Sequence, residues 1–257
     1  MKMKGVVLCG GLGTRLLPLT KLINKHLLPV FSKPMAFYPI QTLVQSGIED
    51  IVIVVGGNNV GDFVPLLGNG EDFGLKRLHY IYQKEPGGIA QALALAEDFV
   101  GDDNVMVILG DNITNGNFRT EVDVFSQGCK IFLKEVPNPE KFGCPIFETI
   151  SYYDEKRKTL IYSQCGQILE IIEKPKIPPS KYAVIGIYIY DAHVFYYIRQ
   201  LKPSARGELE ITDVNNAYLK EGKLNYNFLG MNEFWIDAGS SHENLLQASI
   251  LAKENNL

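Results

Sequence analysis

Strand-forming and helix-forming segments alternate through the first half of the chain. Strands are predicted at residues 6–9, 51–55, 78–83 and 105–109, and helices at about 35–46, 58–67 and 89–96. The first, second and fourth of these strands are apolar throughout, which is typical of parallel strands buried on both faces. Parallel strands need crossover connections, and the helices supply them. The pattern therefore predicts an α/β fold, a Rossmann-like three-layer sandwich with a mostly parallel, mixed central sheet.

The second half is less regular, and no linker separates it from the first. Strands are predicted at residues 130–136, 182–190, 224–229 and 233–236, and helices at 192–201, at 208–221 and after Ser241. Residues 142–173 show only irregular apolar stretches. We therefore expect one domain over residues 1–257, with a subdomain of the second half packed on the same sheet.

The first predicted strand runs directly into a glycine-rich segment, Gly10-Gly11-Leu12-Gly13-Thr14-Arg15. Glycines at these positions let the backbone turn sharply and bring its N–H groups against a ligand. Such N–H groups favour anions, and the guanidinium of Arg15 suits phosphate oxygens. We interpret the segment as a polyphosphate site, although glycines alone fit a plain turn equally well.

Two common nucleotide-binding motifs do not fit this segment. A dinucleotide fingerprint needs a third glycine where Leu16 stands, and an acidic residue where the second strand ends in Gly56-Gly57. A P-loop needs Gly-Lys-Ser/Thr, whereas Gly13 precedes Thr14-Arg15. The prolines within residues 18–29 favour an extended loop over helix entry. The segment is therefore expected to hold a nucleotide in another way.

Composition excludes several classes of partner. The chain has 257 residues, 46% of them hydrophobic, which is enough for a sizeable core. Its net charge is −4 and it has no long basic run, so we expect no nucleic-acid partner. It shows neither a membrane-spanning apolar run nor a leader sequence, so we expect a cytoplasmic protein without a membrane partner. The four cysteines and four histidines lack metal-site spacing, and we expect reduced, structural thiols.

Charged residues follow several predicted strands, at the edge where parallel sheets bind ligands. Asp111 follows the strand at 105–109, and Asp237 follows a short strand late in the chain. Two such carboxylates suit Mg²⁺ bound to a triphosphate, whereas each taken alone could be a turn or cap residue. Lys174 follows Glu173 near another strand end, where it could neutralise a phosphate or form only a surface ion pair.

These charged side chains favour one kind of chemistry. Arg15, Lys25 and Lys174 are candidate cations. Asp111 and Asp237 are candidate metal ligands, and no nucleophile is paired with a base. The set fits a phosphoryl-type transfer, in which positioning and charge neutralisation do most of the work. It does not fit hydrolysis by a Ser or Cys triad.

Taken together, the motifs resemble those of the sugar-1-phosphate nucleotidyltransferase family, most closely its thymidylyl-transferring members. The matching segments are residues 8–15, 25–29, 83, 86–92, 110–112, 173–175, 203–213 and 235–239. They recur in order over nearly the whole chain and are jointly very specific. The resemblance implies that dTTP and glucose 1-phosphate give dTDP-glucose and pyrophosphate, by in-line attack on the α-phosphorus with Mg²⁺ as cofactor.

The resemblance also assigns residues to roles. The implied catalytic residues are Arg15, Lys25, Asp111, Lys174 and Asp237, of which Asp111 and Asp237 hold Mg²⁺. The implied nucleotide-binding residues are Leu8, Gly10, Gly11, Gly13, Thr14, Arg15, Gln83 and Gly88, the last two reading the pyrimidine. The implied sugar-phosphate-binding residues are Asn112, Gly143, Glu173, Lys174, Val184, Tyr188, Arg206 and Trp235. Residues 1–128 would mainly bind the nucleotide, and residues 129–257 would mainly bind the sugar phosphate.

The chain departs from the family pattern at several positions. His26 stands where thymidylyl-transferring members usually have Gln, and Ala238 where they have Thr. Cys144-Pro145 replaces two apolar β-branched residues after Gly143, so the resemblance does not define this part of the sugar-pocket wall. The sequence ends soon after its last predicted helix, before the helices with which longer members build a regulatory nucleotide site and an oligomer contact. A homo-oligomer is expected, but the resemblance favours neither a tetramer nor that regulatory site.

Other functions stay open at this point. The same chemistry with another base, such as uridylyl transfer, or with another sugar phosphate fits the same residues. A non-catalytic nucleotide-sugar-binding regulator is less favoured, because a mere binder does not need the full set of charges. A retaining-type glycosyltransferase is disfavoured because the sequence has no Asp-x-Asp motif.

Overall fold

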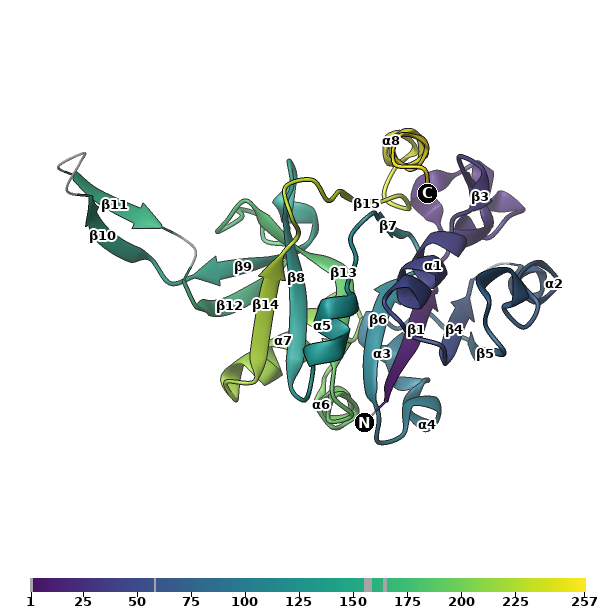
Figure 1. The fold of residues 1–257 in the computed structure, drawn as a ribbon, viewed down its shortest axis with the longest axis horizontal. Coiled ribbons are helices and arrows are strands. Elements are labelled where there is room, and N and C mark those ends of the chain that lie inside the picture. The colour runs from purple at the N-terminus through teal and green to yellow at the C-terminus, as the bar shows by residue number, and fades with distance from the viewer. Residues whose placement is uncertain (1, 58, 155–158, 164–165) are drawn as a thin grey trace.

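A single mixed sheet forms the centre of the protein (Figure 1). The computed structural model describes residues 2–57, 59–154, 159–163 and 166–257. The strand order is β12 (Ile168–Glu173), β9 (Gly143–Phe147), β13 (Tyr182–Tyr190), β6 (Asn104–Leu109), β1 (Met3–Cys9), β4 (Ile51–Gly56) and β5 (Leu78–Gln83). β8 (Cys129–Glu135) pairs with β13 and also with β14 (Leu224–Phe228). The strands from β6 to β5 are parallel, whereas β13 is antiparallel to β6.

Helices cover both faces of the sheet, which confirms the predicted three-layer α/β fold. One face carries α1 (Phe37–Gln45), α2 (Phe63–Leu67) and α5 (Arg119–Val124). The other carries α3 (Ile89–Ala94), α4 (Glu97–Val100), α6 (Val194–Gln200) and α7 (Ile211–Lys220). In β1, Val7 and Cys9 pack into the hydrophobic core beneath α1, α2 and α5. Val6 and Leu8 pack into the core on the other face, because successive side chains of a strand point to opposite faces.

Smaller elements surround the sheet. β7 (Asn112–Thr114) follows β6 and pairs with β15 (Trp235–Asp237). The last helix, α8 (His242–Glu254), packs against β15 and against β2 (Pro29–Val30), which pairs with β3 (Lys33–Pro34). β10 (Ile150–Asp154) and β11 (Thr159–Ser163) form an antiparallel ribbon that extends away from the sheet (Figure 1). Three 3₁₀ helices lie elsewhere: η4 (Val60–Asp62), η5 (Glu71–Phe73) and η6 (Pro139–Lys141).

Three segments differ from the prediction. Residues 18–29 are not simply extended, because short 3₁₀ turns form within this segment and just before it. The turns are η1 (Thr14–Leu16), η2 (Leu19–Lys21) and η3 (Lys25–Leu27). The helix expected from residue 208 begins at Ile211, because the N–H of Leu209 donates instead to the carbonyl of Gly87 at 2.8 Å. The described part of residues 142–173 forms four strands, which Pro145 and a bulge in β12 obscure in the sequence pattern.

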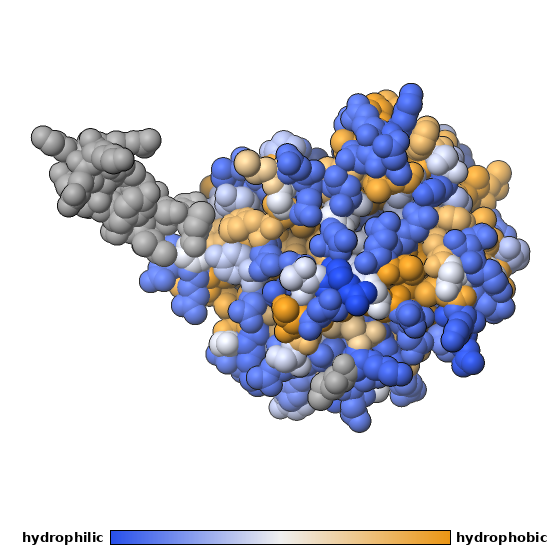
Figure 2. All heavy atoms as spheres, in the orientation of Figure 1, coloured by the Kyte–Doolittle hydropathy of each residue, from blue (hydrophilic) through white to orange (hydrophobic). Residues whose placement is uncertain are grey.

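The surface, the helix lengths and the state of the cysteines can be compared with what the composition predicts. The face in Figure 2 is mostly hydrophilic, with apolar side chains in scattered patches. Within the described ranges, no helix has both the length and the apolar character that crossing a bilayer would require. Cys9, Cys129 and Cys144 are buried free thiols, as expected, and Cys165 lies outside the described residues.

Candidate active site

The carboxyl ends of the parallel strands meet at one edge of the sheet, as the sequence predicts. Gly10 follows β1, Gln83 closes β5 and Asp111 lies just beyond β6. The strands are in parallel register, so these three residues reach the same level of the sheet. All three line one cavity of about 380 Å³.

The glycine-rich loop has the backbone geometry that its sequence predicts. Gly11 and Gly13 have φ of 94° and 64°, in the left-handed region that favours glycine. A Cβ on Gly10 would lie 2.2 Å from Oε1 of Gln83, so a side chain at residue 10 would displace the Gln83 amide from its present position. η1 begins directly after Gly13 and carries Arg15 at the cavity lining. The loop therefore brings bare backbone and a guanidinium to the same cavity.

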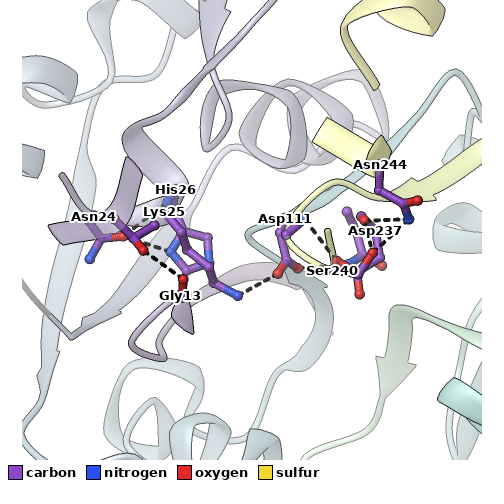
Figure 3. Close-up of polar contacts among 11 residues, drawn as sticks. Gly13, Asn24, Lys25, His26, Asp111, Asp237, Ser240 and Asn244 are labelled. Atoms are coloured by element: carbon purple, nitrogen blue, oxygen red, sulfur yellow. Dashed lines mark hydrogen bonds and ion pairs between the residues drawn. The ribbon is translucent and has the colours of Figure 1, made fainter. Parts of the chain in front are cut away.

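A buried ion pair lies on the cavity wall (Figure 3). Nζ of Lys25 lies 2.6 Å from Oδ2 of Asp111, and their side chains are only 16% and 11% exposed. Nδ2 of Asn112 donates to Oδ1 of Asp111 at 3.0 Å. Burial alone would raise the pKa of Asp111, but the neighbouring Lys25 holds that pKa below its usual value. Burial would likewise lower the pKa of Lys25, and Asp111 raises it above its usual value.

Asp237 reaches this pair through a strand pairing. β15 is antiparallel to β7, with Asp237 opposite Asn112. The N–H of Ala238 donates to the carbonyl of Asp111 at 2.9 Å. A Cβ on Gly239 would lie 2.4 Å from Oδ2 of Asp111, so the two segments approach closely. The structure therefore brings together the two aspartates that the sequence places far apart.

Residues at the start of α8 and just before it anchor Asp237 (Figure 3). The hydroxyl of Ser240 and Nδ2 of Asn244 donate to the Asp237 carbonyl at 2.8 and 3.1 Å. Ser241 caps the helix by accepting from the N–H of Asn244 at 3.1 Å. The N–H of Gly239 donates to Oδ1 of Asp237 at 3.1 Å. These bonds fix the backbone from which the carboxylate extends.

The carboxylates of Asp111 and Asp237 suit a divalent cation that also binds oxygens of a bound ligand. Burial raises the pKa of Asp237, and the charge of Asp111 raises it further, while Lys25 and Arg15 act in the opposite direction. Among the described residues, no three His, Cys, Asp or Glu side chains are grouped to hold a metal by themselves. Mg²⁺ needs no such group, because it binds one or two carboxylates together with phosphate oxygens and water. The pair beside an open cavity therefore fits Mg²⁺.

His26 is buried in the same cavity wall as a neutral ring. Nδ2 of Asn24 donates to the carbonyl of Gly56 at 2.9 Å, which directs Oδ1 of Asn24 toward Nδ1 of His26 at 3.0 Å. Because that oxygen only accepts, Nδ1 carries the proton. Burial, together with the charge of Lys25, lowers the pKa of His26 to about 3.

All residues assigned to the nucleotide line the larger cavity, together with Lys25, Asp111 and Asp237. Sequence reasoning missed further lining residues: Leu12, His26, Pro86, Ile89, Ala92, Leu109, Glu208 and Gly239. Most of them lie inside the matching motifs, so their position within those motifs was the available signal. Leu109 lies outside the motifs, but it ends the strand that leads to Asp111.

A second cavity of about 120 Å³ shares Arg15, Lys174 and Asp237 with the first. Residues assigned to the sugar phosphate line it: Asn112, Gly143, Glu173, Lys174, Val184, Tyr188 and Trp235. Arg206 is the exception, since it lines the larger cavity. Lys141, Phe142, Gly186, Ile211 and Thr212 also line this second cavity and were missed.

Asn112 organises one wall of the second cavity. Its Oδ1 accepts from Nε1 of Trp235 at 2.7 Å and from the N–H of Gly186 at 3.0 Å. The ring of Phe142 meets Trp235 edge-on, with the ring centroids 5.3 Å apart. The indole is therefore fixed by one hydrogen bond and one aromatic contact.

Glu173, which also lines the second cavity, lies in a network of polar groups. Its Oε2 accepts from Oγ1 of Thr212 at 2.5 Å, and its Oε1 lies 3.3 Å from both Nζ of Lys174 and Nη2 of Arg206. Nη2 of Arg206 is also 2.7 Å from Oε2 of Glu210. Arg206, expected as a cation for phosphate, thus has acidic side chains as its partners. Lys174 has φ of 45°, which is uncommon for a residue with a Cβ.

Cys144-Pro145, which departs from the family pattern, lies outside the lining of both cavities. Sγ of Cys144 lies 3.3 Å from the carbonyl oxygens of Ser180 and Tyr182. Because alternate residues of a strand point to opposite faces, Gly143 borders the cavity while Cys144 points away from it.

Comparison with known proteins identifies the class. The profile of the nucleotidyl transferase family matches residues 4–255, and the chain belongs to this family of enzymes. The glucose-1-phosphate thymidylyltransferase of Neisseria meningitidis is 41% identical over 251 residues, which cover 96% of this chain and 81% of the relative.

Two solved structures share the fold over nearly the whole chain. One is a Bacillus anthracis protein assigned as a glucose-1-phosphate thymidylyltransferase, in complex with sucrose. It is 49% identical, has a TM-score of 0.84, and the match covers 98% of this chain and 96% of that one. The other is a UDP-glucose pyrophosphorylase in complex with UDP-glucose. It is 25% identical, has a TM-score of 0.80, and the match covers 99% of each chain.

Proposed function

We propose that this enzyme transfers a thymidylyl group from dTTP to glucose 1-phosphate, forming dTDP-glucose and releasing pyrophosphate. The relative from Neisseria meningitidis, a glucose-1-phosphate thymidylyltransferase, supports the choice of substrates through its 41% identity. The observation that carries the proposal is structural. The buried Lys25–Asp111 pair lies beside Asp237, and Asp237 borders both cavities.

The two cavities suit the two substrates. We place the nucleotide in the larger cavity, against the glycine-rich loop, and the sugar phosphate in the smaller one. Arg15, Lys174 and Asp237 line both, so the reacting phosphates would meet among them. The first half of the chain would then bind mainly the nucleotide, and the second half mainly the sugar.

The reaction needs positioning and charge neutralisation more than proton transfer. An oxygen of the sugar phosphate is already an anion at neutral pH, so it forms a bond to the α-phosphorus without a general base. The bond from the α-phosphorus to the oxygen that bridges it to the β-phosphate breaks, and its electron pair leaves with pyrophosphate. Lys174 holds the attacking phosphate, while Arg15 and Lys25 neutralise the charge of the leaving group.

We propose that Asp111 and Asp237 hold Mg²⁺. When bound, Mg²⁺ neutralises charge on the triphosphate and on the leaving pyrophosphate. Lys25 keeps Asp111 ionised as a ligand. The backbone N–H of Gly239 donates to Oδ1 of Asp237 and so orients that carboxylate.

The test is pyrophosphate release with Mg²⁺, glucose 1-phosphate and either dTTP or UTP. We expect dTTP to be strongly preferred. A strong preference for UTP would replace the thymidylyl assignment with uridylyl transfer, an alternative that the similarity to the UDP-glucose-bound pyrophosphorylase supports. Release at background with every nucleotide and sugar phosphate tried would instead favour a non-catalytic binding protein.

We further propose that the protein acts as a homo-oligomer in the cytoplasm. Light scattering during size-exclusion chromatography would measure the molar mass of the protein in solution. A mass equal to that of one chain would contradict the homo-oligomer. Fractionation of cells that express the chain would test its location.

A further inference from the structure

A hydrogen bond behind the nucleotide cavity links two amide side chains. Nε2 of Gln83 donates to Oε1 of Gln91 at 2.7 Å. Gln83 lines the cavity and is 4% exposed, whereas Gln91 is not part of the lining. Any influence of Gln91 on the nucleotide therefore passes through Gln83.

The amide of Gln83 is held from both sides. A Cβ on Gly10 or on Gly56 would lie 2.2 or 2.9 Å from its Oε1, so this oxygen rests against bare backbone. The stem of Gln91 in turn rests on Gly87, where a Cβ would lie 3.0 Å from Cγ of Gln91. In the part of the chain that the structure describes, the bond to Gln91 is the hydrogen bond that orients the Gln83 side chain.

The segment that carries Gln91 is itself fixed. Gln91 lies in the first turn of α3, three residues after Gly88. The carbonyl of Gly87 accepts from the N–H of Leu209 at 2.8 Å, and the N–H of Ala90 donates to the Leu209 carbonyl at 3.2 Å. Gln91 is therefore a rigid partner for the cavity amide.

We propose that Gln91 is a positioning residue that makes the enzyme select pyrimidines with an N3–H over cytosine. With Nε2 of Gln83 bonded to Gln91, the Gln83 amide would meet the base through Oε1, which is an acceptor. Thymine and uracil offer a donor at N3, whereas cytosine has an unprotonated N3 whose lone pair repels that oxygen. If the Gln83 amide alone turned over, it would present Nε2 to cytosine and set its Oε1 against Oε1 of Gln91, so the two amides would have to turn over together.

This inference deepens the proposed function, since it rests on Gln83 meeting the pyrimidine. The test compares the wild type with Gln91→Glu and Gln91→Met. A carboxylate only accepts, so Glu at this position keeps Nε2 of Gln83 bonded, whereas Met has a similar length and offers no comparable acceptor. Calorimetric titration with dTDP and with dCDP measures the ratio of the two affinities in each protein.

We expect the wild type and Gln91→Glu to bind dTDP more tightly than dCDP. In Gln91→Met this preference should fall by about tenfold, the effect of one hydrogen bond replaced by a mismatch. The KM for dTTP should rise while kcat changes little, because Gln91 does not touch the reacting atoms. Thermal unfolding checks that each variant folds, and Gln91→Ala takes the place of the Met variant if that one does not.

Three results would overturn the inference. The first is equal affinity of the wild type for dTDP and dCDP. The second is a Gln91→Met variant that keeps the wild-type preference for dTDP. The third is a Gln91→Glu variant that loses this preference as much as Gln91→Met does. Pyrophosphate release by the wild type is measured in parallel. Failure of that assay counts against the proposed function, while the binding ratios still decide the role of Gln91.

Discussion

Asp237 of β15 lies directly opposite Asn112 of β7 in an antiparallel pair. Since Asn112 follows Asp111 in the chain, this pairing brings Asp237 to the buried Lys25–Asp111 pair. The same Asn112 accepts from Nε1 of Trp235 at 2.7 Å. One short strand pairing thus positions the candidate metal ligands and a wall of the second cavity together.

Asp111→Asn should lower turnover by at least about a hundredfold, as loss of a charge-stabilising group typically does. The variant removes a charged ligand of the proposed metal and leaves Lys25 without its ionic partner. Pyrophosphate release at saturating substrates measures the effect. Asp123→Asn is the matched control, because Asp123 is 55% exposed and pairs with Arg119 on α5. Near-normal turnover in Asp111→Asn would remove Asp111 from the mechanism.

Arg15→Ala should also lose at least about a hundredfold in turnover, because Arg15 carries a guanidinium from the glycine-rich loop to both cavities. Arg15→Lys should recover part of the loss, since it restores the charge without the planar fork. The same assay applies, with Arg199→Ala as the control in an exposed ion pair with Glu97. Activity of Arg15→Ala equal to that of the control would contradict the assignment.

Features that depend on neighbouring residues in the chain could be predicted from the sequence. The strand β1 and the left-handed Gly11 and Gly13 follow from local composition, and so does Asp111 at a strand end. Asp237 could be proposed as a metal ligand from its place after a predicted strand. Its position opposite Asn112 could not be predicted, because β15 is short and no local pattern reveals its pairing with β7.

Positions whose role depends on distant partners could not be predicted. Helical periodicity places Thr212 and Gln91 on helices, but it does not show that they bond to Glu173 and Gln83. The direction of Cys144 could not be predicted for a similar reason, since it depends on the register of β9 with β12. Long-range pairing and register are set by tertiary packing, which a single sequence does not display.

Thr212→Val should raise the KM for the sugar phosphate by about tenfold, the effect of losing a hydrogen bond to a charged group. The variant removes the hydroxyl that donates to Oε2 of Glu173 at 2.5 Å and keeps a similar volume. The KM for the nucleotide should not change, because Thr212 lines only the smaller cavity. Thr212→Ser retains the hydroxyl and should behave like the wild type. A parallel rise of both KM values would point to general disruption instead.

His26 should make the folded protein sensitive to acid. Its pKa is lowered by burial to about 3 from 6.5, so between these values the unfolded chain binds a proton at His26 and the folded protein does not. Stability from this residue is therefore fully present above pH 6.5 and is lost as the pH falls. His26→Gln removes the titration and should spare the protein this loss.

The measurement is urea unfolding of the wild type and of His26→Gln at several pH values. We expect the free energy of unfolding of the wild type to fall, relative to the variant, by about 1.4 kcal/mol for each pH unit between about 6 and 4. Above pH 7 the difference between the two proteins should be constant, which provides the internal control. A difference that stays constant through the acid range as well would show that His26 takes up its proton equally in the folded and unfolded chain. In that case the ring is not held neutral by the bonded Asn24 and the buried cavity wall.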